Sequence, residues 1–258
     1  MPSAGDPTSG QWFESAALRY YAGWFDSEPD FFTGKGVRVV PSSRLGIPQP
    51  GHSTPLGLLC YAGSGWVRVA HARVWAQRMG GLQSKIEKAT SANLSGVFED
   101  HFRVPAWRGV KFYLKTSPTV DEPDGAFPLE QEDLGDYRDF FAAVHPRAEI
   151  GEWLDDYFYA LVGRHDAWAI RDTGILAAVT DAPDLPWMGD LIVEPGINTR
   201  PEFRRRGYAA RVCGAMIRAA ASSGRAPIWS CGAGNTASQA LAQRLGFHRF
   251  VESYSLPL

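Results

Sequence analysis

The chain has 258 residues, of which 45% are hydrophobic, and 26 Lys and Arg stand against 28 Asp and Glu for a formal net charge of -2. This composition predicts a folded protein with one large domain or two smaller ones, and the lack of a basic excess argues against a nucleic-acid partner. The first ten residues lack the basic start and apolar stretch of a secretory signal, and no apolar run reaches membrane-spanning length. We therefore expect a cytoplasmic protein without a membrane partner.

The cysteines and histidines do not form a metal-binding or disulfide pattern. Cys60, Cys213 and Cys231 are far apart and odd in number, and the six histidines are scattered. We expect neither a disulfide framework nor a metal site, and Cys231, inside an apolar run, is predicted to be a core thiol rather than a nucleophile.

The first half of the chain predicts a helix and several short strands. Gly63-Ser64-Gly65 is a turn signal between two strand-like runs and predicts a hairpin. The expected elements are a helix over 11–25, strands over 37–40, 56–61 and 66–70, a helix over 72–79 and a strand over 109–115. Residues 117–128, SPTVDEPDGAFP, contain three prolines and several acids and are the predicted linker, which divides the chain into domains 1–120 and 121–258.

The second half alternates strands and helices more regularly. The expected elements are helices over 133–144 and 207–222, strands over 167–171, 175–180, 191–193 and 228–231, a helix capped by Asn235, and a last strand from Phe247. Tyr208, Val212 and Met216 form part of an apolar stripe on the helix over 207–222, which makes it the clearest helix of the chain. We expect an α/β fold.

The stretch RRRGYA, residues 204–209, lies where a strand gives way to this strong helix. The first turn of a helix has unpaired N–H groups and the positive end of the helix dipole, so it binds anions such as phosphate. Gly207 would let the backbone come close to such a phosphate, and neighbouring arginines would add charge and donors. A charged helix start exposed to solvent is the other interpretation.

The surrounding residues carry a family resemblance. Arg204, Gly207 and Ala209 match the R/Q-x-x-G-x-G/A loop of the GNAT superfamily of N-acetyltransferases, and NTASQALAQRLGF, from Asn235 on, resembles its N-x-x-A/S-x-x-L-x-x-x-x-G-F segment. The segment 199–203 resembles the end of that family's fourth strand. The resemblance covers about half of the chain, from Leu129 to the C-terminus. It implies a mixed sheet flanked by helices, and we leave open whether the N-terminal domain is a diverged copy of the same fold.

The resemblance implies acetyl-CoA as the co-substrate. Its pyrophosphate would lie on N–H groups of residues 205–209, and its pantetheine would lie between two splayed strands beyond Pro195-Gly196, which interrupts a strand-like run. A turn between two shorter strands explains the same Pro-Gly pair, and Asn235 is either a helix cap alone or also a cofactor contact. The predicted cofactor-binding residues are Ile197, Thr199, Arg204, Arg205, Arg206, Gly207, Tyr208, Ala209, Asn235 and Ser238.

The catalytic residues are less clear from the sequence, because Ala242 stands where many GNAT enzymes have a tyrosine that protonates the departing thiolate. Tyr254 is the nearest replacement in sequence, and a water molecule is the alternative. Glu194, just before the Pro-Gly interruption, is the predicted general base, with Asp190 as the second choice and a solvent-facing glutamate as the other interpretation.

The resulting hypothesis is acetyl transfer to a primary amine of a small molecule by a monomer or homodimer. Residues 229–238, WSCGAGNTAS, resemble the W-x-C-x-x-x-N-x-x-S of a GNAT group that includes zwittermicin A resistance proteins, which suggests an amine-bearing natural product or antibiotic as the acceptor. The alternative is a non-catalytic acyl-CoA-binding or regulatory protein, because the expected tyrosine is absent.

Overall fold

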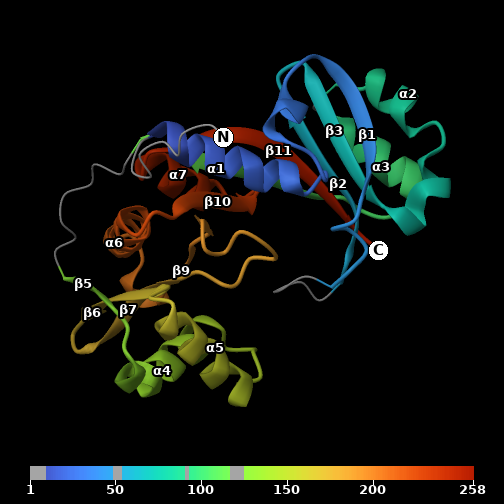
Figure 1. The fold of residues 1–258 in the computed structure, drawn as a ribbon. Coiled ribbons are helices and arrows are strands. Elements are labelled where there is room, and N and C mark those ends of the chain that lie inside the picture. The colour runs from blue at the N-terminus through green and yellow to red at the C-terminus, as the bar shows by residue number, and fades with distance from the viewer. Residues whose placement is uncertain (1–9, 49–53, 91–92, 117–124) are drawn as a thin grey trace.

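The computed structural model describes residues 10–48, 54–90, 93–116 and 125–258, which form two β-sheets with helices packed against them (Figure 1). The larger sheet has seven strands in the order β1 (Gly36–Ser42), β3 (Trp66–Ala72), β2 (Leu56–Gly63), β11 (Phe247–Pro257), β4 (Trp107–Leu114), β10 (Ala226–Gly232) and β8 (Ile192–Val193). The smaller sheet has the order β5 (Ala126–Pro128), β6 (Ala167–Asp172), β7 (Ile175–Asp181) and β9 (Gly196–Thr199). The protein therefore has the expected mixed α/β architecture.

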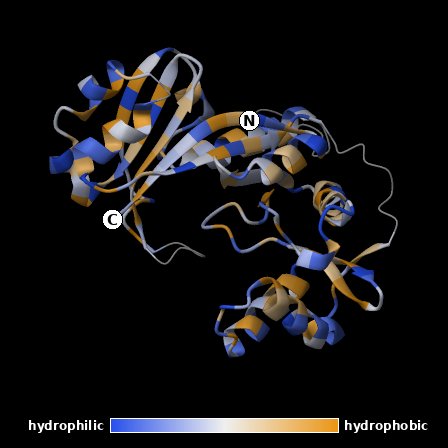
Figure 2. Cartoon of the chain, turned by 180° about the vertical axis from the view of Figure 1, so that it is seen from behind, coloured by the Kyte–Doolittle hydropathy of each residue, from blue (hydrophilic) through white to orange (hydrophobic). Residues whose placement is uncertain are grey.

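Seven α-helices among the described residues cover these sheets. They are α1 (Gly10–Gly23), α2 (Leu82–Glu87), α3 (Leu94–Phe102), α4 (Leu134–Val144), α5 (Glu152–Gly163), α6 (Tyr208–Ser222) and α7 (Thr236–Arg244). Helices α4 and α5 pack on one side of the smaller sheet, and α6 packs against β6 and β7 from the other side (Figure 1). Hydrophobic residues run through the strands, while the helices carry a mixture of polar and apolar residues, as expected for elements with one covered face (Figure 2).

The larger sheet mixes strands from both sides of the predicted domain boundary. Strand β11, from the C-terminal half, pairs antiparallel with β2 on one side and with β4 on the other. Strand β4, from the N-terminal half, pairs antiparallel with β10 along its second edge. Each half thus places a strand between strands of the other half. The division at residues 120 and 121 stays a prediction, but the two parts that it separates share one sheet.

The strand-like run around Pro195 is split between the two sheets. Ile192 and Val193 of β8 pair in parallel with β10, whereas β9, which begins at Gly196, pairs antiparallel with β7. Glu194 and Pro195 lie between the two short strands. Since β9 and β10 are not neighbours in either sheet, the chain opens at this point, where the sequence indicated an interruption.

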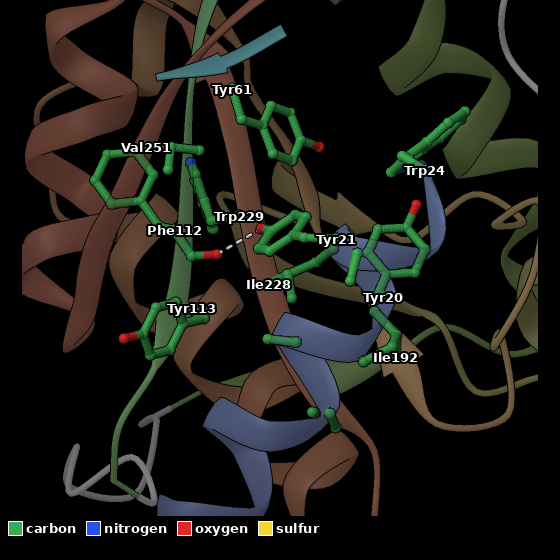
Figure 3. Packing of buried hydrophobic residues seen from close by; sticks show 14 of the residues in the cluster. Tyr20, Tyr21, Trp24, Tyr61, Phe112, Tyr113, Ile192, Ile228, Trp229 and Val251 are labelled. Carbon is green, nitrogen blue, oxygen red and sulfur yellow. Dashed lines mark hydrogen bonds between the residues drawn. The ribbon is translucent and has the colours of Figure 1, made fainter. Parts of the chain in front are cut away.

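Helix α1 closes the core beside the larger sheet. Its buried aromatic residues include Phe13, Tyr20 and Tyr21, and the hydroxyl of Tyr21 donates a 2.8 Å hydrogen bond to the carbonyl oxygen of Phe112 in β4 (Figure 3). A buried hydroxyl costs free energy unless it finds such a partner. The bond therefore allows a tyrosine in the core and fixes α1 against β4.

Several local predictions differ from the structure. Residues Arg73–Met79 form a 3-10 helix rather than an α-helix, and Pro201–Phe203, expected at a strand end, form a 3-10 turn after β9. Helices α2, α3 and α5 were not predicted. Of the predicted linker, residues 117–124 lie outside the described residues, and residues Ala126–Pro128 form β5.

The described residues contain neither a membrane-spanning helix nor a candidate metal site. None of their helices is long and apolar enough to cross a membrane. In the same part of the chain, no group of three or more His, Cys, Asp or Glu side chains could hold a metal ion.

Candidate functional site

A cleft of about 760 Å³ lies where the chain opens between β9 and β10. Strand β9, the loop before α6, the first turn of α6, strand β10 and helix α7 form its walls. Nine of the ten predicted cofactor residues line this one cleft, and Arg206 is the exception. Strand β9 and helix α7, about 40 residues apart in sequence, lie on opposite walls here. Strand β8 pairs with β10, but the next strand, β9, pairs with β7 instead and so leaves the cleft between β9 and β10.

The N-terminus of α6 forms the polar end of the cleft. Gly207 is the N-cap residue with a φ of 83°, and Arg205 has a φ of 63°, so two left-handed residues turn the backbone N–H groups into a concave loop. A Cβ added to Gly207 would meet no atom within 4 Å, because this position faces open space. The geometry is that of an anion site at the start of a 15-residue helix.

Three arginines supply positive charge along the cleft, namely Arg204, Arg205 and Arg244. Within the described ranges, no carboxylate lies at ion-pair distance from any of them. Arg206 instead points away and forms an ion pair of 3.0 Å with Asp172, whose carboxylate also accepts a 2.7 Å hydrogen bond from the hydroxyl of Tyr208. The arginine run is thus divided: Arg206 holds the loop in place, and its neighbours present their charge to the cleft.

Helix α7 forms the opposite wall. The side-chain oxygen of Asn235 accepts a 3.1 Å hydrogen bond from the backbone N–H of Ser238 and caps the helix, as predicted. The hydroxyl of Ser238 accepts a 3.0 Å hydrogen bond from Nε1 of buried Trp229. Both predicted residues line the cleft, and the side-chain oxygen of each already accepts a hydrogen bond within the protein. The cap role of Asn235 therefore accounts for it without a ligand.

Strand β10 adds Cys231, predicted to be a core thiol, and Ser230, which was not predicted, to the wall of the cleft. Cys231 is half-buried on the wall of the cleft rather than in the core, and burial raises the pKa of its thiol, which disfavours a thiolate nucleophile. Its neighbour Ser230 accepts a 2.9 Å hydrogen bond from Nζ of Lys111. Lys111 lies on β4, so the N-terminal half places a cation beside a cleft built by the C-terminal half. No local signal could have indicated this, because β4 reaches the site only through the shared sheet.

Glu194 does not line the cleft. It is half-buried between β8 and β9, near enough to Tyr20 and Tyr21 of α1 for its negative charge to act on their hydroxyl groups. Burial, and next to it the negative charge of Glu194, raises the pKa of the hydroxyl of Tyr20. Asp190, the second choice for the base, is exposed in the loop before β8.

Tyr254 does not line the cleft. It lies on β11, which β4 separates from the cleft strand β10, and it pairs with Arg108 of β4, one residue before Gly109, which pairs with Gly232 of β10. The hydroxyl of Tyr254 donates a 3.0 Å hydrogen bond to Glu252, and the side chain packs near Phe98 in the core of the N-terminal half. The prediction that Tyr254 protonates the leaving thiolate receives no support from this position.

A second cavity of about 540 Å³ lies between α4, α5 and the end of β7. It was not predicted, because α5 was missed and because Asp181 ends an apolar strand without any motif around it. The signal for the helix was present, since Leu154, Phe158 and Leu161 recur at the spacing of an apolar helical stripe. Asn198 of β9 lines both cavities, so they meet along this strand.

Comparisons with known proteins agree with this architecture. Residues 188–256, less than half of the chain, match the GNAT acetyltransferase family model, which supports an acyltransferase. A GNAT-family acetyltransferase from Colwellia psychrerythraea is 14% identical and has a similar fold over 94% of this chain and 96% of its own, with a TM-score of 0.55. At this identity the likeness shows the fold alone.

A second solved structure is less similar in shape. A protein from Novosphingobium aromaticivorans assigned to the GNAT family is 24% identical, with a TM-score of 0.47. The match covers 58% of this chain and 64% of that one, slightly less than two thirds of its length. The search of curated proteins found no match, and none of these comparisons reaches the zwittermicin A resistance group.

Proposed function

We propose that this protein is an N-acetyltransferase that moves an acetyl group from acetyl-CoA to a primary amine of a small molecule. The observation that carries the proposal is the cleft at the strand opening, which ends in the concave N–H loop of α6 and is lined by three arginines without carboxylate partners among the described residues. A ligand with several phosphates and a long uncharged arm fits such a site, and coenzyme A has both. The acyltransferase match over residues 188–256 supports the same function.

The residues of the cleft suit the parts of such a ligand. The N–H groups at the start of α6, together with Arg204 and Arg205, would hold the pyrophosphate, and the space beside Gly207 leaves room for it. The free edge of β9 at Ile197 and Thr199 would bind the amide groups of the pantetheine as an added strand does. When bound, acetyl-CoA supplies an activated acetyl group as a thioester.

The remaining task of the protein is to prepare the amine. A primary amine is mostly protonated at neutral pH, so a proton must leave before the nitrogen can attack a carbonyl carbon. We keep Glu194 as the proposed base, acting through water, because it is the carboxylate that directly precedes the strand opening. A thiol is a good leaving group with a pKa near ~8.5, so water can protonate the departing thiolate in place of a tyrosine.

Release of free thiol from acetyl-CoA, measured with a panel of small primary amines, tests this function. We expect amine-dependent release with acetylated amine as the product, and none without an amine. The alternative, a non-catalytic acyl-CoA-binding or regulatory protein, is favoured by Ala242, which is fully buried where the family's tyrosine would stand. Tight CoA binding without thiol release across the panel would establish that alternative. A cytoplasmic location, a role in antibiotic resistance and a monomeric or homodimeric state stay predictions.

A further inference from the structure

Aromatic side chains from two helices line part of the second cavity. Helix α4 contributes Tyr137, Phe140 and Phe141, and α5 contributes Trp153 and Tyr157. Trp153 is 49% exposed, which places it at the mouth, whereas Tyr137 and Phe140 are buried at the back. A cavity of this size and lining suits a small molecule with a flat or apolar body.

One carboxylate in this cavity has no basic partner. Oδ2 of Asp181 accepts a 3.0 Å hydrogen bond from the hydroxyl of Tyr157, and in the part of the chain that the structure describes no Lys, Arg or His lies within ion-pair distance of Asp181. Burial raises the pKa of Asp181, and the hydrogen bond from Tyr157, a backbone hydrogen bond and the nearby His145 offset only a part of this rise. A buried charge without a partner is costly, so a cation bound beside Asp181 would stabilise its charged form.

The other acid of the cavity is already neutralised. Asp184 lies 2.9 Å from the guanidinium of Arg164, which also reaches Asp166 at 3.1 Å. The cavity therefore offers one carboxylate to a cation rather than two. Aromatic rings around it add cation–π attraction for an ammonium group.

The cavity adjoins the proposed acyl-transfer cleft. Asp181 is paired with Gly196 in the ladder between β7 and β9, and a Cβ at Gly196 would lie 2.5 Å from Oδ1 of Asp181. Only glycine lets the carboxylate pack so closely against β9, and Gly196 itself lines the first cleft. A group bound at Asp181 is thus held next to the strand along which the two cavities meet.

We propose that the second cavity is the acceptor site and that it takes a small primary amine with a single ammonium group on a flat, apolar body. The ammonium binds the carboxylate of Asp181 beside the hydroxyl of Tyr157, and the body lies between the rings of α4 and α5. Compounds with several ammonium groups are disfavoured, because further cations meet Arg164 and no second free carboxylate. The role of the cavity as acceptor site rests on the proposed function, whereas the binding of the amine can be measured without it.

Calorimetry with purified full-length protein and CoA tests this proposal, with 2-phenylethylamine as the probe, 2-phenylethanol as its neutral analogue and spermidine as a polycation. We expect wild type to bind the amine more tightly than the other two. Asp181→Asn should weaken amine binding about 30-fold or more, the lower end of the loss for a buried charge pair that loses one partner, and should leave the alcohol unaffected. Ala160→Phe, at an exposed helix position on the cavity wall, should weaken both by filling the space.

Asp156→Asn is the matched control, because it removes the same charge from an exposed position of α5 outside the cavity. It should bind all three probes as wild type does, and all variants should keep their affinity for CoA. Unchanged amine binding in Asp181→Asn and Ala160→Phe would overturn the proposal, even if acetylation of other amines establishes the proposed function. Tighter binding of spermidine than of 2-phenylethylamine would overturn the proposal that the site takes an amine with a single ammonium group. Asp181-dependent amine binding without thiol release would support the amine site while the proposed function fails.

Discussion

Gly207→Asp is the sharpest perturbation of the proposed CoA cleft. Gly207 caps α6 with a φ of 83°, and a Cβ there would have no neighbour within 4 Å, so the first atom of a new side chain would meet no protein atom. A left-handed conformation costs an L-residue roughly 1 kcal/mol, least for Asn and Asp. An acid at a helix N-terminus returns about 0.3 to 1 kcal/mol. The free energy of unfolding should therefore change by less than about 1 kcal/mol.

Binding of CoA should suffer much more than stability. The carboxylate would occupy the open space in front of the N–H groups of α6, where the pyrophosphate is proposed to lie. Two like charges about 4 Å apart repel by about 4 kcal/mol at the effective dielectric constant of a protein surface. Even half of this repulsion corresponds to a loss of about 30-fold in affinity, and the whole to nearly 1000-fold.

Calorimetric titration with CoA, together with thermal unfolding, measures both effects. Gly207→Asn is the matched control, since it has nearly the same shape and backbone cost without the charge, and it should lose distinctly less affinity than the Asp variant. The difference between the two should shrink at high salt, because counterions screen charges near the surface. A folded Asp variant that binds CoA as tightly as wild type would refute the assignment of this loop.

Four further predictions follow from the site and the fold. Glu194→Gln should lower kcat by ~10²- to 10⁴-fold, remove the acidic limb of the pH-rate profile and leave CoA binding intact, whereas a wild-type profile would reduce Glu194 to a structural carboxylate. Burial raises the pKa of Asp181 above 3.8, so the stability linked to this group is present below that pH and is lost as pH rises through the folded-state pKa. Asp181→Asn should therefore unfold at a higher temperature than wild type at pH 7, with a gap that closes in acid; a lower temperature at pH 7 would contradict this reasoning. Asn235→Ala should cost about 1 kcal/mol in denaturant unfolding because the cap of α7 is lost, and no change would mean that the cap is not needed. A protease site inserted within residues 117–124 should yield two fragments that co-elute after cleavage, because β4 and β11 join the two halves in one sheet. Separate elution of the fragments would contradict the pairing of β4 with β10 and β11.

The C-terminal helices and the cofactor loop could be predicted from the sequence because their signals are local. The stripe of α6, Gly207 at its start and the cap at Asn235 each depend on residues within one or two turns. Such features follow from backbone conformation and nearby hydrogen bonds, which neighbouring residues largely determine. The cofactor-binding residues were predicted from the resemblance to the GNAT family, and nine of the ten line one cleft.

The catalytic roles of Glu194 and Tyr254 stay predictions, and neither residue lines the cleft. Tyr254 follows closely after the cofactor motif, but its side chain packs near Phe98 in the core of the N-terminal half and does not line the cleft. Glu194 directly precedes the opening, and its negative charge acts on Tyr20 of α1. The direction of a strand and the face on which a side chain lies are decided by pairing and packing, which short spacings do not reveal.

Only the tertiary structure decides the remaining features of the site. Lys111 reaches Ser230 because β4 lies between β10 and β11, a pairing of strands more than 100 residues apart. Asp181 becomes an unpaired carboxylate among aromatic rings because α4 and α5 fold over the end of β7 and Gly196 leaves room beside it. The sequence by itself determined the loop and the start of α6, where a phosphate-bearing ligand is proposed to bind, since one loop and one helix are enough to build them. The second cavity, proposed as the acceptor site, depends on long-range packing, because its walls come from four separate segments of the chain.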